Sequence, residues 1–97
     1  MMTIEHIVLL DKKKDATDDQ IQAALNGVQS LKNKIPGVVA VKISNNITDR
    51  APYSHGAIIT MQDLETLKAY GPHPAHQSVL QLLEPVFSSL VVVDIEI

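Results

Sequence analysis

The sequence predicts an α+β fold of the ferredoxin-like kind, in which helices cover one face of a four-stranded antiparallel sheet. Three observations lead to this fold class. Strand-like and helix-like segments follow one another in the order β, α, β, β, α, β, which is the split βαβ arrangement. Several strands are apolar on both faces. The chain of 97 residues has room for one hydrophobic core, so we expect a single domain over residues 1–97.

The N-terminal third predicts a strand followed by an amphipathic helix. β-Branched residues and leucine dominate from Thr3 to about Lys12, as in a β-strand. Thr17 and Gln20 have the spacing of a capping box, which begins a helix, and Pro36-Gly37 ends it. The apolar stripe of this helix consists of Ile21, Ala24, Leu25, Val28, Leu31 and Ile35.

The rest of the chain predicts three strands and a broken helix. Residues 38–45 and 53–62 are strand-like runs joined by a long loop rich in turn-forming residues, which indicates a hairpin. A short helix over 63–70 is interrupted by Gly71-Pro72, and a second helical piece starts at Pro74. This piece extends to about Ser88, although Pro85 should bend it or end it early. The final strand covers 90–97.

The strands suggest how the protein assembles. Ile7 and Leu9 alternate with Val8 and Leu10, so the first strand is apolar on both sides, whereas helices can cover only one side of the sheet. An exposed apolar sheet face usually meets another protein surface. We therefore expect a homodimer that packs sheet on sheet.

Composition excludes several classes of protein. Eight basic and eleven acidic residues give a net charge of -3, which argues against a nucleic-acid partner, and no apolar run is long enough to span a membrane. The chain has no cysteine, and its N-terminus lacks the form of a signal peptide, so we expect a cytoplasmic protein. It also lacks a Gly-rich phosphate loop and a His-Glu-x-x-His helix, and we expect neither a cofactor nor a metal.

Two of the four histidines fall on predicted strands. His6 shares a face with Val8 and Leu10, and His55 shares one with Tyr53 and Ala57. If these strands are neighbours, the two imidazoles could line one pocket. The alternative is that each is a core histidine, hydrogen-bonded to the backbone or to the nearby tyrosine.

The other two histidines lie near the predicted helix break. His73 and His76 are three residues apart, which suits a shared helical face, but two ligands without a carboxylate pair make a weak zinc site. A neutral His76 is a potential general base, and Tyr70 could hydrogen-bond to the same ligand. Alternatively, both side chains only fasten the broken helix to the sheet. Asp94 and Glu96 are expected on a solvated rim.

Four motifs together make the chain resemble the stress-responsive dimeric α/β-barrel (Dabb) family along essentially its whole length. The motifs are Ile4-Glu5-His6-Ile7-Val8-Leu9-Leu10, Ile35-Pro36-Gly37-Val38, Tyr53-Ser54-His55 and His73-Pro74-Ala75-His76. The resemblance implies a ferredoxin-like monomer whose sheet packs on a partner's sheet to close an α/β barrel.

The resemblance also implies candidate site residues. The family includes boiling-stable plant stress proteins without an assigned reaction and a plant cyclase that closes a linear polyketide by aldol condensation. In that enzyme a histidine is the base and a tyrosine assists it, and these residues match His76 and Tyr70. His6 and His55 match histidines that line the same pocket, whereas Val28 replaces a pocket tyrosine. The polyketide substrate is not implied for this chain.

Three functional hypotheses follow. The first is a small cofactor-independent enzyme, or a related ligand-binding protein, that takes a partly apolar carbonyl or phenolic compound. Its catalytic residues would be His76 and Tyr70, and its ligand-binding residues His6, His55, Val8, Leu10, Leu25 and Val28. The second is a non-enzymatic homodimer for stress protection or assembly. The third, a monooxygenase, rests on analogy of fold alone.

Overall fold

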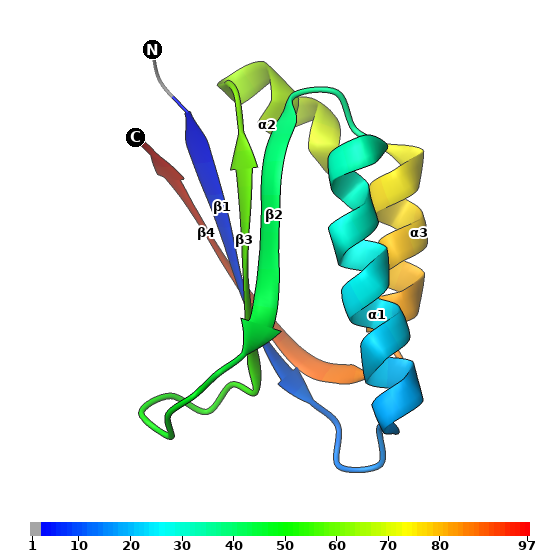
Figure 1. Cartoon of the computed structure of the whole chain (residues 1–97). Coiled ribbons are helices and arrows are strands. Elements are labelled where there is room, and N and C mark those ends of the chain that lie inside the picture. Colours follow the sequence, from blue (N-terminus) through cyan, green and yellow to red (C-terminus); the bar gives the residue numbers. More distant parts are fainter. Residues whose placement is uncertain (1–2) are drawn as a thin grey trace.

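The computed structural model describes residues 3–97 and has the predicted order of elements (Figure 1). Met1 and Met2, which enter the argument against a signal peptide, lie outside the described residues. The elements are β1 (Ile4–Lys12), α1 (Asp18–Ser30), the short 3-10 helix η1 (Leu31–Asn33), β2 (Val38–Asn45), β3 (His55–Met61), α2 (Leu64–Tyr70), α3 (Pro74–Leu83) and β4 (Phe87–Glu96).

The four strands form one antiparallel sheet in the order β2-β3-β1-β4. The two central strands, β1 and β3, are joined through α1 and β2, and the helices lie on one face of the sheet (Figure 1). This is the ferredoxin-like α+β arrangement, and the predicted fold class is confirmed.

Local signals begin each helix where the sequence predicts. The capping box at α1 is complete, because the Thr17 hydroxyl accepts from the Gln20 backbone N–H and the Gln20 side chain accepts from the Thr17 N–H. Asp63 caps α2 by accepting from the Thr66 N–H. Pro74 occupies the first turn of α3, where a missing N–H costs nothing.

Three predicted boundaries differ from the structure, for identifiable reasons. The last helix ends at Leu83 and not near Ser88, which is the early end predicted from Pro85, and β4 consequently begins at Phe87 and not at Leu90. The third strand begins at His55, not at Tyr53. The Asn46 side chain donates to the Tyr53 carbonyl at 2.8 Å and holds that residue in the preceding loop.

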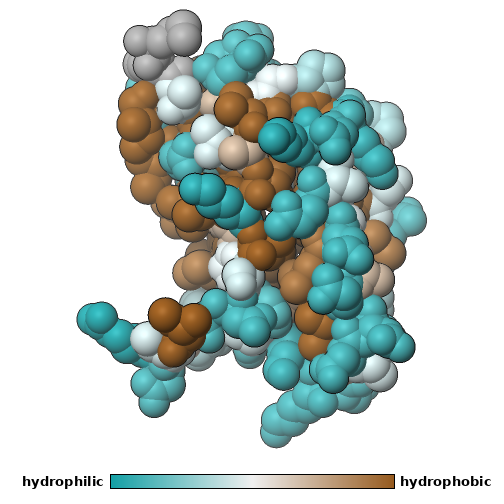
Figure 2. All heavy atoms as spheres, in the orientation of Figure 1, coloured by the Kyte–Doolittle hydropathy of each residue, from teal (hydrophilic) through white to brown (hydrophobic). Residues whose placement is uncertain are grey.

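The two faces of the sheet differ in what covers them. The helices bury the inner face over the central strands β1 and β3, where Ile4, Leu10 and Met61 are at most 4% exposed. Residues on the opposite side form what we call the outer face, and its apolar members are Ile7, Leu9, Ile58, Val91, Val93 and Ile95. Apolar atoms gather on this side, away from the helices (Figure 2). Ile58 and Val93 remain 40% and 50% exposed there.

Within residues 3–97, no helix has the length and apolar character needed to cross a membrane.

Candidate functional site

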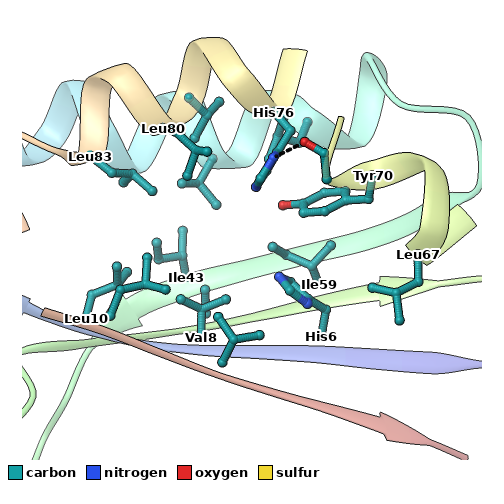
Figure 3. Close-up of a pocket in the computed structure, with 17 residues that line it drawn as sticks. His6, Val8, Leu10, Ile43, Ile59, Leu67, Tyr70, His76, Leu80 and Leu83 are labelled. Atoms are coloured by element: carbon teal, nitrogen blue, oxygen red, sulfur yellow. Dashed lines mark hydrogen bonds between the residues drawn. The ribbon is translucent and has the colours of Figure 1, made fainter. Parts of the chain in front are cut away.

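A cavity of about 260 Å³ lies between the helices and the inner face of the sheet (Figure 3). Its polar side chains, His6, Tyr70 and His76, lie together at one end, and apolar side chains make up the rest of the wall. The complete lining is His6, Val8, Leu10, Val28, Leu31, Ile43, Ala57, Ile59, Leu67, Tyr70, Gly71, His76, Val79, Leu80, Leu83, Leu90 and Val92. Such a site suits a largely apolar ligand with one polar group.

The cavity opens beneath β4. Leu90 and Val92 pair with Leu10 and Val8 and so belong to the inner face, yet they are 45% and 42% exposed. The helices therefore leave this strand uncovered.

The break between α2 and α3 orients His76. The Gly71 carbonyl lies just beyond the end of α2, where helix carbonyls lack an intrahelical partner. His76 Nδ1 lies 2.9 Å from this oxygen and donates to it, because a carbonyl can only accept (Figure 3). In the neutral imidazole the lone pair is therefore on Nε2, which points into the cavity (Figure 3).

Tyr70 lies between the two histidines. It is the last residue of α2, is 4% exposed, and has its ring 4.4 Å from the His76 ring and 5.1 Å from the His6 ring. Its hydroxyl points into the cavity beside His76 (Figure 3). Burial, with a smaller contribution from the Asp94 carboxylate, raises the pKa of Tyr70 to about 12. The phenol therefore stays protonated and is a hydrogen-bond donor at neutral pH.

Asp94 holds His6 and is still exposed, as expected for a residue on the rim. The two residues are directly opposed in the pairing of β1 with β4, and His6 Nδ1 lies 2.5 Å from Asp94 Oδ1. Because a carboxylate accepts, His6 donates from Nδ1, and its Nε2 is left for a ligand. The sequence offers no signal for this contact, since it depends on which strands are neighbours and in which register.

His55 lies elsewhere, and the expectation that it shares a pocket with His6 is wrong. It is on the inner face, but it pairs with Leu10, whereas His6 pairs with Ile59. Four residues of strand separate the two positions, which is about 13 Å. The His55 ring is 5% exposed and packs edge-on against Phe87, with ring centroids 5.6 Å apart.

One ring nitrogen of His55 has a partner within the chain. Its Nδ1 is 2.8 Å from the Ser54 hydroxyl, which also accepts from the Lys12 backbone N–H. Burial first, and then the charge of Lys12, lower the pKa of His55. These contacts fasten the start of β3 to the end of β1, although the partner of His55 is a serine side chain and not the backbone or the tyrosine of the core-histidine alternative.

Of the four apolar residues predicted for the site, three line the cavity and one does not. Val8, Leu10 and Val28 line the cavity, whereas Leu25 does not. On α1, Val28 and Leu31 face the cavity. The helical repeat turns Leu25 away from the cavity, and Leu25 is half-buried.

His73 does not act with His76. Its Nδ1 accepts from the Ala75 backbone N–H at 3.0 Å and so caps α3, as expected for the residue before Pro74. Over residues 3–97, no group of three potential metal-ligating side chains comes together.

Comparison with known proteins gives close matches over nearly the whole chain. Olivetolic acid cyclase from Cannabis sativa is 25% identical over 96 residues, which are 96% of this chain and 95% of the cyclase. A hydroxynitrile lyase from Passiflora edulis superposes with a TM-score of 0.89 at 20% identity, covering 98% of this chain and 93% of the lyase.

A third similar protein, from Thermobifida fusca, is described as dimeric, ferredoxin-like and of unknown function. Its structure superposes with a TM-score of 0.85 at 23% identity and covers 99% of this chain and 92% of its own. The sequence pattern of the Stress responsive A/B Barrel Domain matches residues 4–97. The chain therefore belongs to the stress responsive A/B barrel domain family.

Proposed function

We propose that this protein is a small cofactor-independent enzyme that removes a proton from the carbon next to a carbonyl group. The observation that carries the proposal is the orientation of His76. Its Nδ1 is occupied by the Gly71 carbonyl, so the basic nitrogen of the neutral ring faces an apolar cavity. A general base needs an unprotonated nitrogen within reach of the substrate.

The two neighbouring side chains have complementary roles in this proposal. Tyr70 donates a hydrogen bond to the substrate oxygen, where negative charge develops as the proton leaves. Its raised pKa keeps that proton on the phenol. His6 offers Nε2 to the same end of the substrate, and Asp94 fixes the orientation of the His6 ring. His76 and Tyr70 would be catalytic, and His6 would bind and position the substrate.

The cavity wall favours an uncharged substrate. Among the described residues, no lysine or arginine lines the cavity, so a carboxylate or phosphate would lack a partner there. Val8, Leu10 and Val28 belong to the apolar part of the wall. We therefore propose a carbonyl compound with an apolar body as the substrate, and a phenolic compound with such a body only as a bound ligand. Two of the similar proteins are named as a cyclase and a lyase, which supports an enzyme.

The test measures deuterium incorporation at the α-carbon of simple ketones in D₂O by NMR. 2-Heptanone and phenylacetone are suitable probes, because each joins an uncharged carbonyl to an apolar body. The wild-type protein should accelerate exchange over buffer, and His76→Gln should lower the catalysed rate by about 100-fold or more.

His73→Asn is the matched control. It removes a histidine three residues away on the same helix and retains a good capping residue, so exchange should be unchanged. Full-rate exchange in His76→Gln would reject the role of His76. Absence of catalysis in the wild type toward either ketone would argue against proton abstraction and for the non-enzymatic alternative.

We also propose that the protein is a homodimer that packs through the outer face of the sheet. The exposed apolar residues Ile58, Val91, Val93 and Ile95 support this, since a contiguous apolar face usually has a partner. Solved proteins of this fold are described as dimeric. Sedimentation velocity should detect a dimer that Val93→Asp dissociates. A stress-protective homodimer without enzymatic activity would use the same interface.

A further inference from the structure

The loop between β2 and β3 is an ordered projection, which we call the arm (residues 46–54). The Asn46 side chain closes it by donating to the Tyr53 carbonyl at 2.8 Å, and its Oδ1 accepts from the Thr48 N–H at 3.0 Å. The Asn46 N–H donates to the Ser54 carbonyl at 2.8 Å. The arm extends away from the side of the sheet that carries the helices (Figure 1).

The arm presents one large apolar side chain to solvent. Ile47 is 93% exposed, more than any other large hydrophobic residue among those the structure describes. Figure 2 shows an isolated apolar group on this projection, surrounded by polar atoms. Hydrogen bonds of the neighbouring Asn46 hold the backbone at this position, so the exposure of Ile47 is a fixed feature of the surface.

A hollow of about 410 Å³ lies between the arm and the sheet. Its walls include Ile47, Ala51 and Tyr53 of the arm, and Leu9 and Gly56 contribute from the strands. Leu9 and Gly56 are paired neighbours on the outer face. The hollow is therefore continuous with the apolar surface proposed above as the dimer interface.

The outer face is close in size to the surface that a stable dimer needs, so contacts outside the strands strengthen association. Four strands of about eight residues give a flat area of roughly 500 Å², and the accessible area is larger because side chains stand up from the sheet. A stable interface usually buries about 800 Å² of accessible surface on each partner. A two-fold dimer uses the same patch twice, so a projection beside a hollow is self-complementary.

We infer that the arm of each protomer closes over the partner copy and that Ile47 is buried in the dimer. This inference rests on the proposed homodimer. It adds a contact outside the sheet whose loss weakens association without altering the monomer, because Ile47 makes little contact within its own chain.

The experiment is sedimentation equilibrium of the chain and four variants. Ile47→Ser should raise the dimer dissociation constant at least about tenfold, because each dimer loses two buried isoleucines. Asn46→Ala keeps Ile47 but removes the side-chain hydrogen bonds that close the arm, and it should raise the constant several-fold. Leu64→Ser is the control, since Leu64 is also exposed, at 47%, but lies on α2.

The outcomes separate the arm from the dimer itself. If Val93→Asp dissociates the dimer and Ile47→Ser does not change its dissociation constant, the arm contact is overturned and the sheet interface stands. Equal weakening by Leu64→Ser and Ile47→Ser would also overturn the arm, since the effect would not be specific. A wild-type monomer at all concentrations would overturn both. Unchanged unfolding midpoints of the dilute variants would confirm that the monomer fold is retained.

Discussion

The inner face of the sheet has a histidine at each end, and the two ends differ in almost every other respect. At one end, His6 borders an open cavity together with Tyr70 and His76. At the other, His55 is 5% exposed, with its ring against Phe87 and its Nδ1 bonded to Ser54. The two residues lie on the neighbouring strands β1 and β3, and both point toward the helices.

This difference shows that residue type and strand face do not determine a histidine's role. What distinguishes the two ends is the break between α2 and α3, which brings Tyr70 and His76 over the His6 end and leaves a void there. At the His55 end, the side chain of Phe87 at the start of β4 fills the space. The cavity end is suited to chemistry, and the packed end to stability.

Replacing Tyr70 should have the largest effect of the changes that test this contrast. Tyr70→Phe removes the hydroxyl that faces the cavity and keeps the ring, so ketone α-proton exchange should fall about 100-fold. Ionisation of Tyr70 should also cause no loss of wild-type exchange up to about pH 10, because the pKa of Tyr70 is raised to about 12. Exchange rates measured by NMR from pH 7 to pH 10 test both points, and a Tyr70→Phe variant of wild-type rate would remove Tyr70 from the mechanism.

Replacing His55 should change stability and leave catalysis intact. His55→Ala deletes a buried ring and its contact with Phe87, and we expect it to lower the free energy of unfolding by about 2 kcal/mol. The loss should exceed that of His6→Ala, since the His6 ring borders an existing cavity. Urea unfolding measures these changes, and a loss of ketone exchange in folded His55→Ala would contradict the division between the two ends.

Asp94 should have a smaller effect, because it acts only through His6. Asp94→Asn retains the shape of the side chain but replaces the carboxylate that accepts from His6 Nδ1, so the exchange rate should fall about tenfold. A double-mutant cycle with His6→Ala tests the mechanism: once His6 is absent, Asp94→Asn should have no further effect. Additive losses would mean that Asp94 acts independently of His6.

The smallest expected effect is a pH dependence of stability from His55. Burial and the charge of Lys12 lower the pKa of His55 below its ordinary value of 6.5, so the unfolded chain binds the proton more tightly. This contribution to stability is complete above about pH 6.5 and is lost as the pH falls through the lowered folded-state pKa. The unfolding midpoint should drop between pH 7.5 and pH 5.5, and the drop should be smaller in His55→Gln. Identical drops in the two proteins would show that other groups cause it.

Periodicity and capping signals were sufficient to predict the order of the elements, because they are local. Thr17 with Gln20, Asp63 and Pro74 each start a helix by contacts within a few residues. The motif around His76 and Tyr70 was informative for the same reason, since the break that joins them is short. The contact between His6 and Asp94 spans 88 positions and depends on strand order and register, which the sequence does not display.

His55 illustrates the same limit, because strand register cannot be predicted from the sequence. Alternation along the strand correctly predicted which face of the sheet carries His55. It could not predict the distance between His55 and His6, because that distance depends on the register of β1 against β3. Leu25 fails for a related reason: helical spacing defined an apolar stripe about 100° wide, and only part of that stripe faces the cavity.

β4 belongs to two surfaces at once. Leu90, Val92 and Asp94 face the cavity and His6, whereas Val91, Val93 and Ile95 alternate with them on the outer face. In a dimer built on the outer face, the same strand would carry both the wall of the binding site and the subunit contact. A ligand that shifts β4 would then link binding to association: each would change the equilibrium constant of the other by the same factor, and ligand affinity would depend on protein concentration.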